Sequence, residues 1–144
     1  MTPTLRRKLL RLFWTLTAVF WVSIFVATHI PAQRLPDVSV SDKFMHFVAY
    51  FVLASLVYIS TRLTNPSRNG LGATVIAIAM VYGAIDELLQ PLVNRNADLD
   101  DWLYDVGGAV CAVFLLAAAR RIHDFWNSRA SRSRASLENQ AAAP

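Results

Sequence analysis

Charged residues are scarce in this chain: 17% of its 144 residues are Asp, Glu, Lys or Arg, against roughly 25% in soluble domains. Hydrophobic residues make up 55%, above the usual range of about 45–50%. The one cysteine, Cys111, excludes an intramolecular disulfide, so cysteine content indicates no redox compartment. The chain also lacks a Gly-rich phosphate loop, so nothing in it supports soluble nucleotide chemistry, and it lacks H-E-x-x-H or another sharp metal-binding motif. These shortages favour a membrane protein with a single domain.

Four apolar segments are each long enough to cross a membrane as a helix. A helix needs about 20 residues to cross ~30 Å of hydrocarbon, and the segments cover about residues 9–28, 44–60, 71–90 and 101–119. A cleaved signal peptide fits the first segment less well, because its apolar core would be only about 7–15 residues long with a small-x-small exit. We predict an all-α polytopic membrane protein. It has a four-helix transmembrane domain over residues 1–126 and a disordered cytoplasmic tail over residues 127–144.

The distribution of Lys and Arg predicts the orientation of the chain in the membrane. Most of them lie before the first segment, between the second and third, and after the fourth: Arg6, Arg7, Lys8, Arg11, Arg62, Arg68, Arg120, Arg121, Arg129, Arg132 and Arg134. The loops 29–43 and 91–100 hold only Arg34, Lys43 and Arg95. The positive-inside rule then places both termini in the cytoplasm and these two loops outside. The basic excess is therefore a topology signal, and we expect no nucleic-acid partner.

Ionisable and polar residues are spaced along one face at the outward end of three segments. They are Asp42, His46 and Tyr50 on the second, Tyr82, Asp86 and Gln90 on the third, and Asp101 and Asp105 on the fourth. Lys43 and Glu87 are each one position round the helix from these faces. Residues four apart share a helix face, and a rise of ~1.5 Å per residue puts His46, Asp86 and Asp105 each ~6 Å inside its helix end. Polar groups at this depth should turn away from lipid into the bundle. We therefore predict an outward-facing pocket lined by His46, Tyr50, Asp86, Glu87, Gln90, Arg95 and Asp105.

Some of these residues also have plainer interpretations. Asp42 can serve only as a helix N-cap, and Lys43 as a cation at the membrane interface. Asp86 and Glu87 point about 100° apart on a helix, so both cannot aim equally at one point. Small residues on the third and fourth segments should let the helices approach closely; they are Gly83, Gly107, Gly108, Ala109 and Ala112.

Three ordered motifs resemble those of the VanZ-like membrane protein family. They are Asp42-Lys43-x-x-His46-x-x-x-Tyr50, Asp86-Glu87-x-x-Gln90 and Arg95-x5-Asp101-x3-Asp105-x2-Gly108, within about residues 40 to 115. Many family members have Asn where this chain has Asp105. The resemblance implies a small multi-pass protein of the bacterial plasma (inner) membrane. It also implies a link to glycopeptide antibiotic resistance, because the family takes its name from a member linked to low-level teicoplanin resistance.

Binding of an envelope lipid is the first of three competing functions. The ligand would be an anionic headgroup or a lipid-linked wall precursor. Arg95 and Lys43 would hold its phosphate, and His46 and Tyr50 would orient it. A structural or interaction module, in which the polar clusters only hold helices together, is the last of the three, and the remaining one is an intramembrane enzyme. Four spans without an internal repeat leave little room for a transport path, unless the chain forms a homo-oligomer.

The second function is an intramembrane enzyme acting on such a lipid. His46 would be a general base, oriented by Asp86 or Glu87. Alternatively, His46 with Asp86, Glu87 and Asp105 would hold a divalent metal such as zinc or manganese. We expect no other cofactor. The candidates for chemistry are thus His46, Asp86, Glu87 and Asp105, and those for binding are Asp42, Lys43, Tyr50, Gln90, Arg95 and Asp101.

Overall fold

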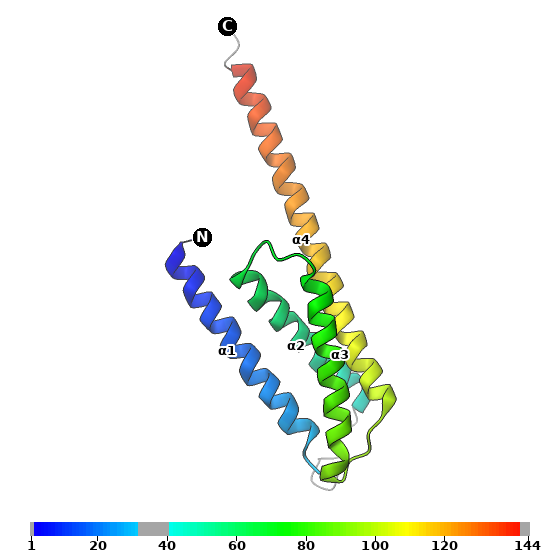
Figure 1. The fold of residues 1–144 in the computed structure, drawn as a ribbon. Coiled ribbons are helices and arrows are strands. Elements are labelled where there is room, and N and C mark those ends of the chain that lie inside the picture. The colour runs from blue at the N-terminus through cyan, green and yellow to red at the C-terminus, as the bar shows by residue number, and fades with distance from the viewer. Residues whose placement is uncertain (1, 32–40, 142–144) are drawn as a thin grey trace. The chain divides into compact units, whose positions relative to one another are not determined.

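The computed structural model describes residues 2–31 and 41–141, and within these ranges it contains helices and no strand. The elements are α1 (Pro3–Thr28), α2 (Asp42–Thr64), α3 (Leu71–Leu89), the 3-10 helix η2 (Gln90–Val93) and α4 (Leu99–Ala141), as Figure 1 shows. The segments Pro3–Thr28, Asp42–Thr64, Leu71–Val93 and Leu99–Ser133 are long and apolar enough to cross a membrane. The predicted all-α fold with four membrane-spanning helices is therefore confirmed.

The chain divides into two compact units, Met1–Val113 and Phe114–Pro144, and the first contains every predicted site residue. Successive helices of the first unit run in opposite directions (Figure 1). Consequently α1 and α3 end where α2 and α4 begin, and the three polar motifs come together at this end.

The second unit contains the rest of α4, which continues as a helix to Ala141. Between Ala109 and Ala141 the sequence has no Gly or Pro, the two residues that most strongly oppose a helix. Composition led us to expect disorder over residues 127–144, and the described part of that segment is drawn as helix in Figure 1. The disorder of the segment in water stays a prediction.

The amino-terminal end of α1 is joined to the last turn of α2. Thr2 caps α1 and Pro3 occupies its first turn, a position where the missing N–H of proline has no cost. One turn later, the Arg6 guanidinium donates hydrogen bonds to the carbonyl oxygens of Leu63 at 3.0 Å and Thr64 at 3.1 Å. The last carbonyls of a helix lack partners within it. Arg6 therefore satisfies the end of α2 and ties the two helices together.

Small residues bring α2 and α4 into backbone contact. A Cβ atom placed on Gly108 would collide with the carbonyl oxygen of Phe47, and Ala109 beside it is fully buried. Close approach of this kind is typical of small residues between membrane helices. Since His46 directly precedes Phe47, the same approach brings its imidazole within reach of Asp105 on α4.

Candidate functional site

A hydrogen bond between α2 and α4 occupies the middle of the site. Nδ1 of His46 and Oδ1 of Asp105 are 2.9 Å apart, and the two residues are 5% and 0% exposed. When Nδ1 carries the hydrogen and donates a hydrogen bond to Asp105, Nε2 has no proton and is free to act as a base or a metal ligand. The partner of His46 is therefore Asp105, whereas the sequence led us to expect Asp86 or Glu87.

Gly83 on α3 makes room for this pair. A Cβ atom there would lie 3.0 Å from Oδ2 of Asp105 and 3.4 Å from the Tyr50 hydroxyl. Both residues are fully buried, and neither of these two oxygens has a hydrogen-bond partner in the described part of the chain. Two unpartnered oxygens from α2 and α4 thus face the same point on α3.

Asp86 faces α1 instead of the His46 pair. Its Oδ1 accepts a hydrogen bond from the Thr28 hydroxyl at 2.9 Å and lies 3.6 Å from Nδ1 of His29. Thr28 and His29 were not among the predicted site residues. A Thr-His pair that ends an apolar segment at the level of the carboxylates is the signal that would have identified them.

We expect Thr28→Val to destabilise the protein by about 1.5 kcal/mol, because hydrogen bonds to charged groups contribute roughly 1.5–3 kcal/mol. The change keeps the shape of the side chain but leaves the buried Asp86 without its 2.9 Å donor. Thr74→Val is the matched control, since within the described residues the Thr74 hydroxyl bonds only the carbonyl of Gly70, the N-cap of its own helix, at 3.2 Å. Denaturant unfolding in detergent measures both variants. Equal stability of the two would contradict the importance of the Thr28–Asp86 contact.

Glu87 is hydrogen-bonded to Gln90 and to the segment between η2 and α4. Its Oε1 accepts a hydrogen bond from the Gln90 side-chain amide at 2.9 Å, and its Oε2 accepts one from the backbone N–H of Asp98 at 2.8 Å. Glu87 and Gln90 are 6% and 1% exposed. The two neighbouring carboxylates therefore bind different parts of the chain: Asp86 contacts α1, and Glu87 contacts the segment before α4.

Lys43 pairs with carboxylates at the exposed edge of the site. Its Nζ lies 2.6 Å from Oδ2 of Asp100 and 3.4 Å from Oδ2 of Asp98. The backbone N–H of Asp100 donates to Oδ1 of Asp98 at 2.9 Å. This hydrogen bond, together with Lys43, holds the pKa of the Asp98 carboxyl below its usual value. Lys43 thus forms its ion pairs with exposed carboxylates and not with the buried Asp86, Glu87 or Asp105.

Arg95 is also paired at this edge, through Asp42. Its guanidinium lies 3.3 Å from Oδ2 of Asp42 and 3.5 Å from the carbonyl oxygen of Ala27. The sequence led us to expect Arg95 in the pocket, where it would hold the phosphate of a ligand. In the described ranges it forms its ion pair with Asp42, which is half exposed.

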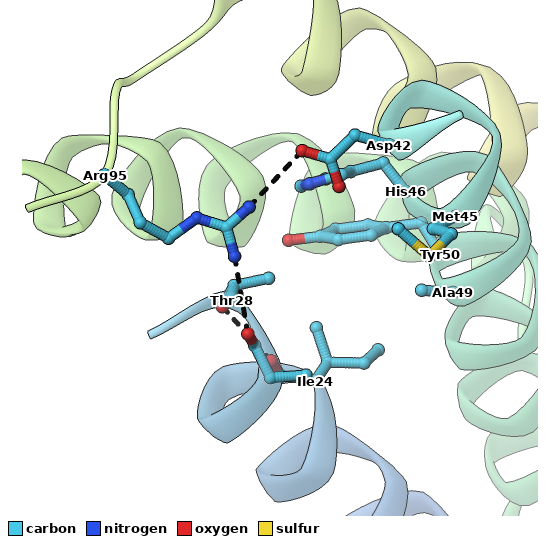
Figure 2. A pocket seen from close by; sticks show the side chains of 9 residues that line it. Ile24, Thr28, Asp42, Met45, His46, Ala49, Tyr50 and Arg95 are labelled. Atoms are coloured by element: carbon cyan, nitrogen blue, oxygen red, sulfur yellow. Dashed lines mark hydrogen bonds and ion pairs between the residues drawn. The ribbon is translucent and has the colours of Figure 1, made fainter. Parts of the chain in front are cut away.

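A cavity of about 200 Å³ lies beside these groups (Figure 2). It is lined by Ile24, Ala27 and Thr28 of α1, by Asp42, Met45, His46, Ala49 and Tyr50 of α2, and by Arg95. Asp42, His46 and Tyr50 of α2 face Arg95, and Ile24 lies on the opposite side from Asp42 (Figure 2). Of the predicted lining residues, His46, Tyr50 and Arg95 line this cavity, whereas Asp86, Glu87, Gln90 and Asp105 do not.

Two sets of side chains have the spacing of metal ligands. In the buried set, His46, Glu87 and Asp105 each offer one ligand atom within 4.8 Å of the other two. In the second set, His46 is joined by Asp42 and by Asp101, whose Oδ1 has no hydrogen-bond partner among the described residues. Both sets include His46, so its imidazole can be a ligand in one set or the other.

These features define a multi-pass helical membrane protein with a buried His–Asp pair next to a partly apolar cavity. A profile of the VanZ/LLP1 family matches residues 2–120. The chain therefore belongs to this family, as its three motifs predicted. Comparisons with curated proteins and with solved structures found no match.

Proposed function

We propose that this protein binds the anionic headgroup of an envelope lipid or a lipid-linked wall precursor in the cavity beside Arg95. The observation that carries the proposal is the composition of the cavity wall. Ile24, Ala27 and Ala49 give it an apolar part, and His46 and Arg95 give it a basic part. A membrane amphiphile has this same division between an apolar chain and an anionic head.

Arg95 has the properties of an anion-binding group. Its side chain is only 12% exposed, and its contacts of 3.3 and 3.5 Å are longer than the about 2.7–2.9 Å of a strong charge-assisted hydrogen bond. A guanidinium has five N–H donors in a planar fork that matches phosphate. Arg95 thus keeps donor capacity that a phosphate oxygen can use.

The size of the cavity supports a headgroup and not a whole lipid. Its volume of about 200 Å³ equals that of roughly seven water molecules and is below the range of about 300–1,000 Å³ for pockets that enclose a drug-sized ligand. The acyl or prenyl chains of the ligand therefore stay in the bilayer, beside the apolar side chains of α1 and α2.

The proposal includes a place and an orientation in the cell. The excess of Lys and Arg in the first residues, together with Arg62 and Arg68 near the turn between α2 and α3, supports cytoplasmic termini and an outward-facing site. The protein then lies in a bacterial plasma membrane with its cavity at the outer interface, where wall precursors are exposed. A role in glycopeptide resistance would follow if the ligand is such a precursor.

We expect Arg95→Ala to lower retention of an anionic phospholipid about tenfold, which corresponds to a lost contact of ~1.4 kcal/mol. Native mass spectrometry of protein released from nanodiscs of mixed anionic and zwitterionic phospholipids measures the retained lipid. Arg68→Ala is the matched control, because it removes one exposed positive charge from the turn at the other end of the first unit. Parallel nanodiscs with a lipid-linked wall precursor distinguish the two sources of phosphate.

The possible outcomes separate the competing functions. Equal retention by the Arg95 and Arg68 variants would refute headgroup binding at the cavity and favour a structural module. The 2.9 Å contact between His46 and Asp105 also favours an enzyme in which Asp105 orients His46 as a general base. In that case the retained species would be a lipid fragment in wild type and the intact lipid in His46→Ala.

A further inference from the structure

Histidines are the only basic partners of the buried carboxylates next to the cavity among the described residues, His46 for Asp105 and His29 for Asp86. Asp86, Glu87 and Asp105 are at most 6% exposed. In the described part of the chain, no Lys or Arg forms an ion pair with any of them, because Lys43 and Arg95 pair with the carboxylates at the exposed edge. A buried charge is costly unless it is paired or coordinates a metal. Among the described residues, the three carboxylates therefore lack the permanent positive charge that a Lys or Arg partner would supply.

The atoms around this point are also short of hydrogen bonds. Oδ2 of Asp105 and the Tyr50 hydroxyl have no partner in the described ranges, although both residues are 0% exposed. The two oxygens lie 3.0 and 3.4 Å from the same position above Gly83. Buried polar groups are nearly always satisfied, so two unpartnered oxygens beside the same position on α3 indicate a ligand between the helices.

We propose that His46, Glu87 and Asp105 bind a divalent metal ion, with one imidazole nitrogen and two carboxylate oxygens as its ligands. One atom from each side chain lies within 4.8 Å of the other two, whereas ligands around a tetrahedral zinc ion at about 2.0–2.2 Å lie roughly 3.4 Å apart. Small side-chain rotations close this difference. Three protein ligands leave a coordination position open, as in catalytic zinc sites.

The ligand chemistry selects the class of metal. An imidazole with two carboxylates suits Mn²⁺ or Zn²⁺, whereas Mg²⁺ and Ca²⁺ prefer oxygen ligands alone and Cu(I) prefers thiolates. The ion would neutralise the buried carboxylates and, through His46, would stand beside the lining of the cavity. This inference goes beyond headgroup binding, since the ion binds whether or not a lipid occupies the cavity.

The buried set is favoured over the alternative of Asp42, His46 and Asp101. Asp42 is half exposed and already paired with Arg95 at 3.3 Å, so it has both water and a cation to stabilise its charge. Glu87 and Asp105 lie in the interior, away from water, and neither has a Lys or Arg partner among the described residues. An ion therefore gains more from the buried carboxylates than from the one at the edge.

Binding of Mn²⁺ to the full-length protein in detergent, after removal of metals with a chelator, tests the proposal. Electron paramagnetic resonance measures free Mn²⁺ during a titration, and we expect about one bound ion per chain, displaced by Zn²⁺. Asp105→Asn and Glu87→Gln should each weaken binding by more than the about 10–100-fold that loss of a supporting residue costs. Asp42→Asn is the matched control and should bind as wild type does.

Two further measurements keep the result interpretable. Mn²⁺ should raise the thermal midpoint of wild type and not that of Asp105→Asn, because an ion stabilises only the form that binds it. Pulsed resonance of the wild-type complex should detect a nitrogen coupled to Mn²⁺ and should lose it in His46→Gln. Absence of stoichiometric binding or of the nitrogen would overturn the proposal. It would also be overturned if only Asp42→Asn lost the ion. Lipid retention without Mn²⁺, measured as above, shows independently whether headgroup binding holds.

Discussion

We expect Gly108→Ala to destabilise the protein by about 3 kcal/mol, the upper part of the range for overpacking a well-packed interior. A Cβ at this position would collide with the Phe47 carbonyl and lie 3.0 Å from the backbone nitrogen of Phe51. These are backbone atoms of α2, which cannot rotate away as a side chain can. The two helices must therefore separate to admit one methyl group.

The neighbouring glycine provides the control for this change. A Cβ on Gly107 would meet only the Phe47 ring, at 3.8 Å, which is an ordinary contact. Gly107→Ala should therefore be neutral, or stabilising by up to about 1 kcal/mol through the better helix propensity of alanine. Denaturant unfolding in detergent compares the two variants with wild type. Equal stability of the two variants would show that α2 and α4 do not pack through Gly108.

The same glycine links the packing of the helices to the candidate site. Phe47 directly follows His46 on α2, and Gly108 lies three residues after Asp105, on the same face of α4. Separation of the backbones at Gly108 therefore lengthens the 2.9 Å contact between His46 and Asp105. For this reason Gly108 is better understood as part of the machinery that positions the site than as a packing residue alone.

Sequence patterns sufficed to predict the spans and the meeting of the polar motifs. Hydropathy and length identify four helices, because a bilayer requires both. The spacing of Asp42, His46 and Tyr50 places them on one face, and antiparallel connections bring that face to the level of Asp105. Two of the small residues were also found from sequence, since neighbours would lie within 3.0 Å of a Cβ on Gly83 and closer still on Gly108, whereas the close approach of Val113 to Gly72 was not predicted.

The spacing of residues along the sequence does not predict which side chains pair with each other across helices. Glu87 and Asp86 are adjacent in sequence, and only the packing of α1 assigns Asp86 to Thr28 and leaves Glu87 to the segment before α4. The pairing of Arg95 with Asp42 likewise depends on the path of residues 94–98. Local sequence constrains the direction of a side chain along its own helix, but not which helix stands opposite.

We expect Gly83→Leu to abolish the Mn²⁺ binding proposed for His46, Glu87 and Asp105 without altering any ligand. A Cβ at position 83 would lie 3.0 Å from Oδ2 of Asp105 and 3.1 Å from Trp102. The rest of the leucine side chain would then fill the space between the helices where the ion is proposed. Overpacking costs about 1–3 kcal/mol, which the better helix propensity of leucine offsets by up to ~0.8 kcal/mol, so the variant should remain folded.

Ala84→Leu is the control, because Ala84 is half-buried beside a shallow surface depression with room for a larger side chain. The titration with Mn²⁺ should show no bound ion in Gly83→Leu and wild-type binding in Ala84→Leu. Retention of lipid through Arg95 should fall less than metal binding, since Trp102 and Asp105 do not line the cavity and Tyr50, which does, lies farther from the new side chain, at 3.4 Å. A folded Gly83→Leu protein that binds Mn²⁺ as tightly as wild type would place the ion elsewhere. Equal losses of lipid and metal would instead mean that both ligands share the space above Gly83.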